Sequence, residues 1–288
     1  MRPARFVWAA LLVPFFVHAS FAQPPRTDGA RSGDDDRRGA EHYRAGRFEE
    51  AVESFARAVR ARPTDANAVN NLGMAYSALG RREEAEAALK RAVGLKPDFA
   101  AAHYNLGSVY YEAGRREEAA AAFAEAVRLK PEHANAQHNL GVVRLELGRY
   151  AEAVESLKEA VRLAPRWAQA NYMLALAHYG SGRRAEAVEF LREAVRLKPA
   201  YAAAHNSLGV AHYHAGRRAE ALGSFRAAVR TNPSYAAARY NLGVAGLALS
   251  ERDVAFEQYR ALKSLDETLA ARLYGGLYKN MLLDVTNK

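Results

Sequence analysis

The sequence predicts an all-α protein, a solenoid of about seven antiparallel helix pairs followed by a C-terminal capping helix. Two residue types mark the period. Prolines recur every 34 residues, at Pro63, Pro97, Pro131, Pro165, Pro199 and Pro233. Glycines keep the same spacing, at Gly46, Gly80, Gly114, Gly148, Gly182 and Gly216. Between these markers apolar residues recur at steps of three and four, which is the period of an α-helix.

Each repeat is predicted to hold two helices joined by a tight turn. In residues 100–133, Leu106 lies on the apolar stripe of the first helix, and Gly114 ends that helix because glycine adopts a left-handed cap without steric cost. Glu117 then opens the second helix, where an acidic side chain suits the positive end of the helix dipole. Pro131 follows this helix and cannot continue it.

A glycine in the middle of the first helix predicts a close helix crossing. Gly107 costs roughly 1 kcal/mol relative to alanine in a helix, so its position calls for a packing reason. We expect Ala119 and Ala126 to supply the facing small surface, and Phe123 to fill the space between neighbouring pairs.

The N-terminus has the pattern of an export signal. Arg2 and Arg5 precede an apolar run from Phe6 to Val17, and small residues follow at positions 20 and 22. We expect residues 1–22 to be a cleaved signal peptide, with an uncleaved membrane anchor as the alternative. The expected location is secretion across the inner membrane into a bacterial periplasm.

The repeat markers divide the rest of the chain. Residues 23–34 are rich in proline, glycine and charge and predict a disordered linker. The solenoid is expected over 35–265, in units 35–65, 66–99, 100–133, 134–167, 168–201, 202–235 and 236–265. Residues 266–288 are expected to form the capping helix, beginning at Asp266, and a tail.

The composition excludes several kinds of chemistry. The 288 residues contain no cysteine, which rules out disulfides, thiol nucleophiles and thiolate metal sites. No phosphate-binding loop, serine elbow or zinc-binding helix motif is present, so neither an enzyme nor a cofactor is predicted. His178 and His212 hold equivalent places in two repeats and are interpreted as packing residues rather than metal ligands.

The repeated positions resemble those of the tetratricopeptide repeat (TPR) family. Residues 66–99 carry Leu72, Gly73, Tyr76, Ala85 and Pro97 at the family's positions, and residues 100–133 repeat the set. The resemblance covers roughly residues 35–265. It implies a right-handed superhelix with a concave inner face lined by the first helices. The repeats are similar to those of O-linked N-acetylglucosamine transferases, but no length remains for a catalytic domain.

The resemblance also places candidate partner-binding residues on the inner face. Asparagines recur there, and an amide can pair with a peptide backbone through both its donor and its acceptor. In the alternative interpretation these asparagines bond only the neighbouring repeat. Tyrosines nearby suit a peptide interface. The candidate residues are Asn71, Asn105, Asn139, Asn206, Asn241, Tyr104, Tyr111, His138, Tyr172, Tyr179, Tyr213 and Tyr240.

Arginines recur at the turn inside each pair, as Arg81-Arg82, Arg115-Arg116, Arg183-Arg184 and Arg217-Arg218. With the net charge of +9, they suggest an alternative function, binding of anionic envelope glycan or lipid. The other interpretation is solubility and pairing with the glutamates that follow.

The main predicted function is a non-enzymatic scaffold. It would bind an extended peptide or partner segment in the groove, in assembly of an envelope, pilus or secretion complex. A protein or peptide partner is expected and nucleic acid is not. Membrane contact is at most peripheral after signal cleavage, and the oligomeric state is left open.

Overall fold

The structure, a computed structural model, describes residues 33–286, with side chains through Leu277. Every element in this part of the chain is an α-helix. The helices are α1 (Asp34–Arg44), α2 (Phe48–Ala61), α3 (Ala66–Ala78), α4 (Arg82–Leu95), α5 (Ala100–Glu112), α6 (Arg116–Leu129), α7 (Ala134–Glu146), α8 (Tyr150–Leu163), α9 (Ala168–Gly180), α10 (Arg184–Leu197), α11 (Ala202–His214), α12 (Arg218–Thr231), α13 (Ala236–Ala248), α14 (Arg252–Leu265) and α15 (Glu267–Thr286).

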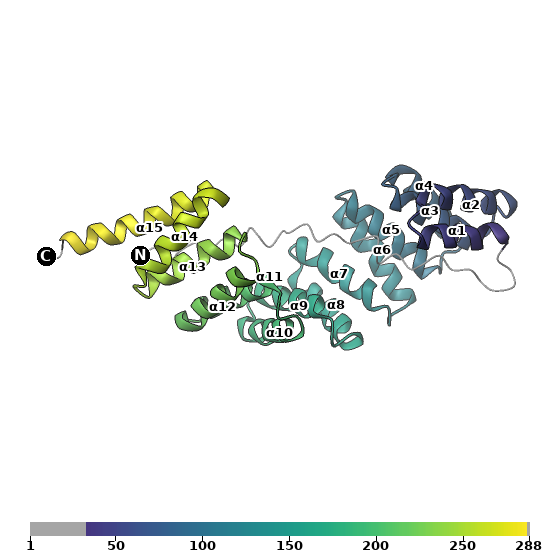
Figure 1. The fold of residues 1–288 in the computed structure, drawn as a ribbon. Helices are drawn as coiled ribbons and strands as arrows, with labels where there is room; N and C mark the ends of the chain where they lie inside the picture. Colours follow the sequence, from purple (N-terminus) through teal and green to yellow (C-terminus); the bar gives the residue numbers. More distant parts are fainter. Residues whose placement is uncertain (1–32, 287–288) are drawn as a thin grey trace. The chain divides into compact units, whose positions relative to one another are not determined.

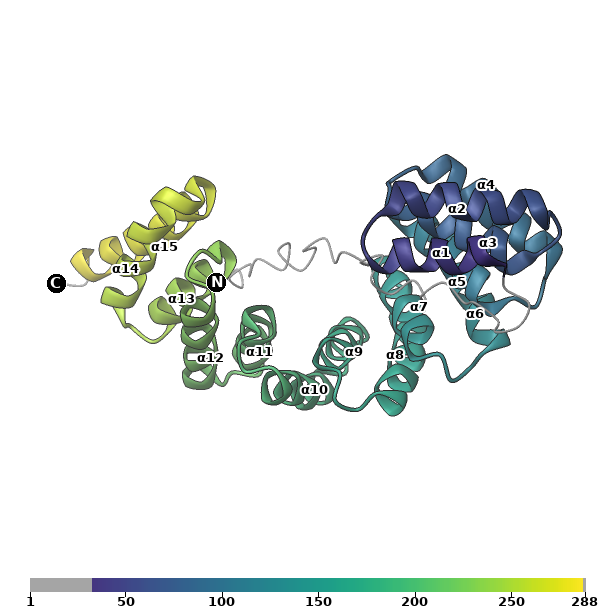
Figure 2. The same cartoon turned by 45° about the vertical axis from the view of Figure 1, so that its right-hand side comes forward.

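The chain forms two compact units. The first unit holds α1–α8 and ends at Pro165, and the second holds α9–α15 and begins at Arg166. Within each unit consecutive helices pack as pairs, and successive pairs stack side by side (Figures 1 and 2). This confirms the predicted all-α repeat solenoid. The predicted signal peptide, and the predicted linker except its last two residues, lie outside the described residues; α1 begins at Asp34.

The turns inside the pairs have the backbone that the glycines predict. The turn glycine of each of the first six repeats has a positive φ, between 72° and 82°. In the seventh repeat Ser250 takes this place and has φ 62°, a conformation that is strained for a residue with a Cβ atom. Glycine is therefore required by the backbone at these turns, and Ser250 is tolerated at a cost.

The close crossing at the mid-helix glycine is present, but the facing residue differs from the prediction. A Cβ atom added to Gly107 would lie 2.8 Å from the Phe123 ring, and one added to Gly141 would lie 2.5 Å from Leu157. Phe123 therefore fills the space inside its own pair, directly over the glycine. Ala119 and Ala126 are fully buried beside it. The glycine makes room for a large side chain rather than for a small one.

The last helix covers the end of the second unit. Leu269, Leu273 and Leu277 of α15 are buried, and Leu273 packs against Gly243 of α13. The carboxylate of Asp266 accepts a hydrogen bond from the Leu269 backbone N–H at 2.9 Å, which caps the helix start. The exposed end of the repeat stack is thereby shielded by an apolar helix face.

Candidate functional site

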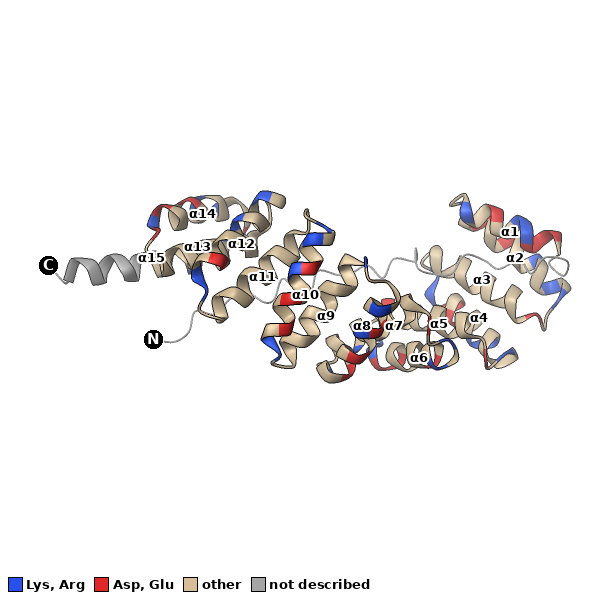
Figure 3. Cartoon of the chain, turned by 90° about the horizontal axis from the view of Figure 1, so that it is seen from below, with Lys and Arg blue, Asp and Glu red and all other residues tan. Residues whose placement is uncertain are grey.

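Apart from α1, the first helices of the pairs carry little charge. Helices α3, α9 and α11 contain no lysine, arginine, aspartate or glutamate, and they are tan in Figure 3. Charged residues are concentrated on α1, on the second helices and in the turns. The surface presented by the first helices therefore depends on amides, aromatic rings and small residues.

Polar side chains join the first helices of neighbouring repeats, and we call this set the polar ladder. In the first unit Asn105 donates to the Asn70 amide oxygen at 2.9 Å, and Asn139 donates to the Tyr104 hydroxyl at 3.1 Å. In the second unit Asn241 donates to Asn206 at 2.9 Å, and the Tyr172 hydroxyl lies 3.4 Å from that of Ser207. Each bond spans 35 residues, so each joins one repeat to the next.

The candidate asparagines are buried, which corrects their predicted exposure to a ligand. Their side chains lie between stacked helices, and the exposed fraction does not exceed 4% at Asn71, Asn105, Asn139, Asn206 or Asn241. The physical reason is that this position lies where first helices of adjacent repeats approach each other. A buried amide without a partner costs free energy, and the NH2 groups of Asn105, Asn139 and Asn241 donate to an amide or a hydroxyl of the preceding repeat. The structure favours the alternative in which asparagine bonds the neighbouring repeat.

Most candidate aromatic residues are also buried. Tyr104, Tyr172, Tyr111, Tyr240 and His138 are buried among the helices. Burial raises the pKa of Tyr104 and Tyr172, and burial lowers the pKa of His138 to about 4. These side chains hold the stack together rather than project from it.

Tyr179 and Tyr213 are the candidate tyrosines that stay half-buried. They lie near the C-terminal ends of α9 and α11 in the second unit. The Arg184 guanidinium carbon lies 5.8 Å from the centre of the Tyr179 ring. The Tyr179 and His214 rings lie 6.4 Å apart. The predicted binding residues therefore separate into a buried group and this partly accessible pair.

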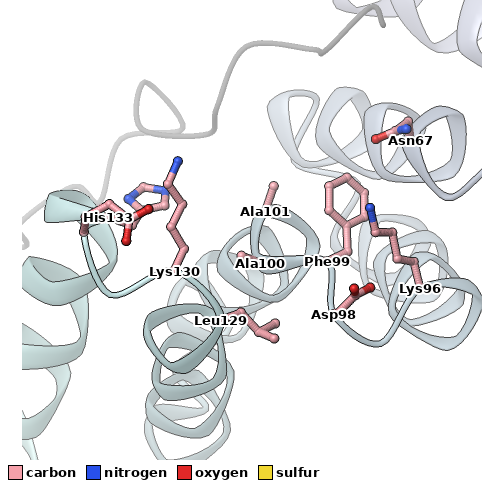
Figure 4. Close-up of a pocket in the computed structure, with 10 residues that line it drawn as sticks. Asn67, Lys96, Asp98, Phe99, Ala100, Ala101, Leu129, Lys130 and His133 are labelled. Atoms are coloured by element: carbon pink, nitrogen blue, oxygen red, sulfur yellow. The ribbon is translucent and has the colours of Figure 1, made fainter.

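A pocket of about 340 Å³ lies at the N-terminal ends of the first helices in the first unit. Ala101 lies at its centre in Figure 4, with Lys130 and His133 on one side and Phe99 and Lys96 on the other. The Lys96 ammonium lies 5.3 Å from the centre of the Phe99 ring. Asn67, Asp98, Ala100, Leu129 and Glu132 complete the lining.

His133 connects this pocket to the polar ladder. Its ring stacks on Tyr104 with centroids 5.0 Å apart, and its Nδ1 accepts the Ala136 backbone N–H at 3.3 Å. The pocket thus has a rigid aromatic wall and two lysine side chains at its rim. Its lining also includes the carboxylates of Asp98 and Glu132, so charged groups of both signs lie around it. The sequence analysis missed it, although lysines before the repeat prolines, at positions 96, 130 and 198, were a periodic signal.

Three turn arginines of the first unit, Arg81, Arg115 and Arg116, are engaged with glutamates, as one interpretation predicted. Arg81 pairs with Glu84, and Arg115 pairs with Glu118 and, at 2.7 Å, with Glu86 of the preceding repeat. Ion pairs between exposed groups of this kind contribute little to stability. These ion pairs neutralise part of the positive charge on which a continuous basic edge would depend.

The described residues contain no group of three or more histidine, cysteine or acidic side chains that could hold a metal ion. His178 and His212 are both buried, and His178 stacks on Phe190 with ring centroids 5.3 Å apart. None of the described helices combines the length and apolar character needed to cross a membrane.

Comparison with known proteins places the chain in a family. The tetratricopeptide repeat model matches residues 37–98, 70–134, 104–168, 172–231 and 215–270. The chain belongs to the tetratricopeptide repeat family, whose members are scaffolds for interactions between proteins. No curated protein matches it by sequence.

Solved structures of the same repeat type are similar to the chain. YrrB, described as a TPR protein with an unusual peptide-binding site, is 26% identical over 65% of this chain and 97% of its own, with a TM-score of 0.61. MamA from Desulfovibrio magneticus RS-1 is 26% identical over 59% and 96%, with a TM-score of 0.56. PilF of Pseudomonas aeruginosa, 21% identical over 73% and 96% with a TM-score of 0.62, shares the fold.

Proposed function

We propose that the protein is a non-enzymatic scaffold that holds an extended segment of a partner protein against its first helices. The observation that supports this proposal most directly is the pocket beside Ala101. It lies next to first-helix residues of adjacent repeats that are joined by the hydrogen bonds of the polar ladder. A rigid surface lowers the entropy cost of binding, because its groups are in place before the partner arrives. The peptide-binding site described for YrrB supports the same use of the repeats.

The residues expected to touch the partner differ from the buried asparagines. Ala101 and Asn135 occupy equivalent places in two repeats and are half-buried. Each lies one helical turn before a ladder residue, Asn105 or Asn139, so each belongs to the same helix face as that residue. With the pocket, they define the proposed partner-binding face of the first unit. Tyr179 and Tyr213, at the opposite ends of their helices, are the half-buried candidate tyrosines of the second unit and are not part of this face.

The test is to obstruct this face with a matched control. Ala101→Arg with Asn135→Arg places two large side chains on the face. Ala87→Arg with Ala121→Arg places the same two side chains at exposed positions of α4 and α6, with the same spacing. Peptides selected on the wild-type protein from a random dodecapeptide library serve as probes, with affinity measured by fluorescence anisotropy. The face variant is expected to lose about tenfold or more in affinity, and the control less than about threefold. Equal losses in both variants would reject the proposed face.

We also propose that the protein is exported to a bacterial periplasm and acts there in assembly of an envelope, pilus or secretion complex. The support is the basic, apolar and small-residue pattern of residues 1–22. After expression of the full chain in a bacterium, the osmotic-shock fraction should contain a protein whose first residue is Gln23. Retention of the full mass in the membrane fraction would instead support the uncleaved anchor.

A further inference from the structure

The two units differ in charge. Residues 33–165 contain 20 lysines and arginines against 21 aspartates and glutamates, so the first unit is nearly neutral. Residues 166–288 contain 17 against 10. The positive balance of the protein is therefore concentrated in the second unit. The repeat period allows equivalent positions of the two units to be compared directly.

In the first unit, a turn arginine, a tyrosine and a glutamate form a closed group. The Arg116 guanidinium lies 4.1 Å from the centre of the Tyr111 ring and forms an ion pair with Glu146. The Tyr111 hydroxyl donates to the other carboxylate oxygen of Glu146. A carboxylate supplied by the next repeat thus completes the group in this unit.

The equivalent group in the second unit lacks the carboxylate. Tyr179 and Arg184 stand at the places of Tyr111 and Arg116, and His214 stands at the place of Glu146. Burial, and after it the Arg184 guanidinium, lowers the pKa of His214, so the imidazole is neutral at neutral pH and adds no negative charge. The position that holds an anion in the first unit holds none in the second.

Two neighbouring acidic residues also differ between the units, whereas Glu186 and Glu220 keep the places of Glu84 and Glu118. The places of Glu83 and Glu117 in the first unit are taken by Ala185 and Ala219 in the second. In the described part of the chain, no ion pair is formed by Arg183, Arg184, Arg217 or Arg218. These arginines stand at the N-terminal ends of α10 and α12, where the helix dipole already favours an anion. The positive charge of these side chains and the helix dipole therefore act in the same direction on an approaching anion.

A buried histidine lies beside the same arginines. His212 of α11 is only 6% exposed, and a hydrogen bond with the Glu220 backbone acts to raise the pKa of its ring. Arg217, Arg192 and Glu220 are the charged groups that act on its ring. Burial chiefly, and then Arg217 and Arg192, lower its pKa, while Glu220 acts in the opposite direction.

We propose that this edge binds an acidic segment of a partner protein, one of whose carboxylates takes the place that Glu146 fills in the first unit. We call it the arginine edge and define it by Tyr179, Arg183, Arg184, His214, Arg217 and Arg218. Arginine pairs with carboxylates in a bidentate geometry, and in the first unit the Glu146 carboxylate occupies this position on the same scaffold.

A peptide fits the edge better than a membrane surface or a second copy of the chain. Tyr179 and Tyr213 are half-buried and do not project as apolar anchors would. The acidic N-terminus of α1 is already engaged, since Asp34, Asp35 and Asp36 pair with Arg37, Arg57 and Arg62. This surface is separate from the proposed partner-binding face of the first unit. A result that rejects binding at one of the two surfaces therefore leaves the proposal for the other intact.

The first experiment compares two charge reversals of equal size in the full protein. Arg184→Glu with Arg218→Glu alters the edge, and Arg230→Glu with Arg260→Glu alters exposed arginines elsewhere in the second unit. The probe is a fluorescent octaglutamate peptide, with an octaglutamine peptide as the uncharged reference. The edge variant should bind octaglutamate about tenfold more weakly, and the control less than about threefold more weakly. Equal losses would mean attraction by net charge alone and would overturn the proposal.

The second experiment introduces the missing carboxylate as a side chain of the protein itself. His214→Glu supplies the carboxylate that Glu146 provides in the first unit, and His214→Gln removes the ring without supplying one. His214→Glu should weaken octaglutamate binding several-fold without lowering the unfolding midpoint, and His214→Gln should leave affinity within about twofold. Unchanged binding by His214→Glu would overturn the proposal. So would binding of phosphatidylglycerol vesicles, sensitive to Arg184→Glu, without binding of the peptide.

Discussion

The amide of Asn105 donates to Asn70 of the preceding repeat, and the same contact recurs between Asn241 and Asn206. Both pairs are buried, so each amide replaces a hydrogen bond to water with one to the adjacent repeat. Removing one partner leaves the other buried and unsatisfied. The ladder is therefore expected to act on stability and on the register of the repeats.

Asn105→Ala tests this contribution. The substitution should lower the free energy of unfolding by about 1–3 kcal/mol, because the Asn70 amide loses its partner. Asn70→Ala combined with Asn105→Ala should cost less than the sum of the two single substitutions. Urea denaturation followed by circular dichroism measures all three variants. Additive losses would show that the two amides are not coupled.

His138 gives a residue-level prediction about pH. Burial lowers its pKa from 6.5 to about 4. The unfolded chain therefore binds more protons as the pH falls from 6.5 towards 4. The contribution to stability is complete above that window and is lost within it. At pH 5 the loss should be about 2 kcal/mol.

The variant His138→Asn isolates this effect, because asparagine stands at the equivalent positions 70 and 206. The difference in unfolding free energy between pH 7.5 and pH 5 should be smaller in the variant than in the wild type by about this amount. Identical pH dependence of the two proteins would contradict the assignment.

At the scale of the helix pair, alanine substitutions at two mid-helix glycines distinguish the effect of packing on stability from the effect of helix propensity. A Cβ atom on Gly209 would lie 2.5 Å from Phe225, whereas one on Gly223, in the second helix of the same repeat, meets nothing within 4 Å. Gly209→Ala should destabilise the protein by about 1–3 kcal/mol through overpacking. Gly223→Ala should stabilise it by up to about 1 kcal/mol. Thermal unfolding of both variants gives the sign, and stabilisation by Gly209→Ala would refute the close crossing.

The last turn offers a second prediction at this scale. Ser250 has φ 62°, where glycine stands in the other six repeats. Ser250→Gly should relieve the steric strain and raise the free energy of unfolding by about 0.5–1 kcal/mol. The matched change Gly216→Ser introduces the same strain in the sixth repeat and should lower stability by a similar amount. Chemical denaturation of both checks the pair, and a loss for Ser250→Gly would argue against strain at this turn.

For the whole molecule, the period of 34 residues determined most of the fold. Glycine and proline mark where helices end for local steric reasons, so helix boundaries could be predicted without any knowledge of packing. The residue that packs against Gly107 could not be predicted in this way. Phe123 and Ala119 both follow the apolar period, and only the packed structure shows which of them faces the glycine.

The candidate site was harder to predict than the fold. A residue that recurs along the repeats serves either packing or binding, and the period alone does not separate the two. Asn105 has asparagine counterparts at 71 and 139 and is buried, whereas Ala101 lines the pocket at a place that holds asparagine in both adjacent repeats. The arginine edge was visible as a charge pattern. Its restriction to the second unit depends on which arginines form ion pairs with glutamates, and only the three-dimensional structure shows these pairs.

The central claim is that the polar ladder holds the repeats together while the half-buried residues beside it hold the partner. One paired measurement tests it, namely peptide affinity and urea midpoint for Asn105→Ala with Asn139→Ala and for Ala101→Arg with Asn135→Arg. The ladder variant should have a lower midpoint and, where still folded, an affinity within about twofold of wild type. The face variant should lose affinity at a nearly unchanged midpoint. A ladder variant that loses peptide binding with its stability intact would show that the asparagines are ligand groups, and would contradict the account.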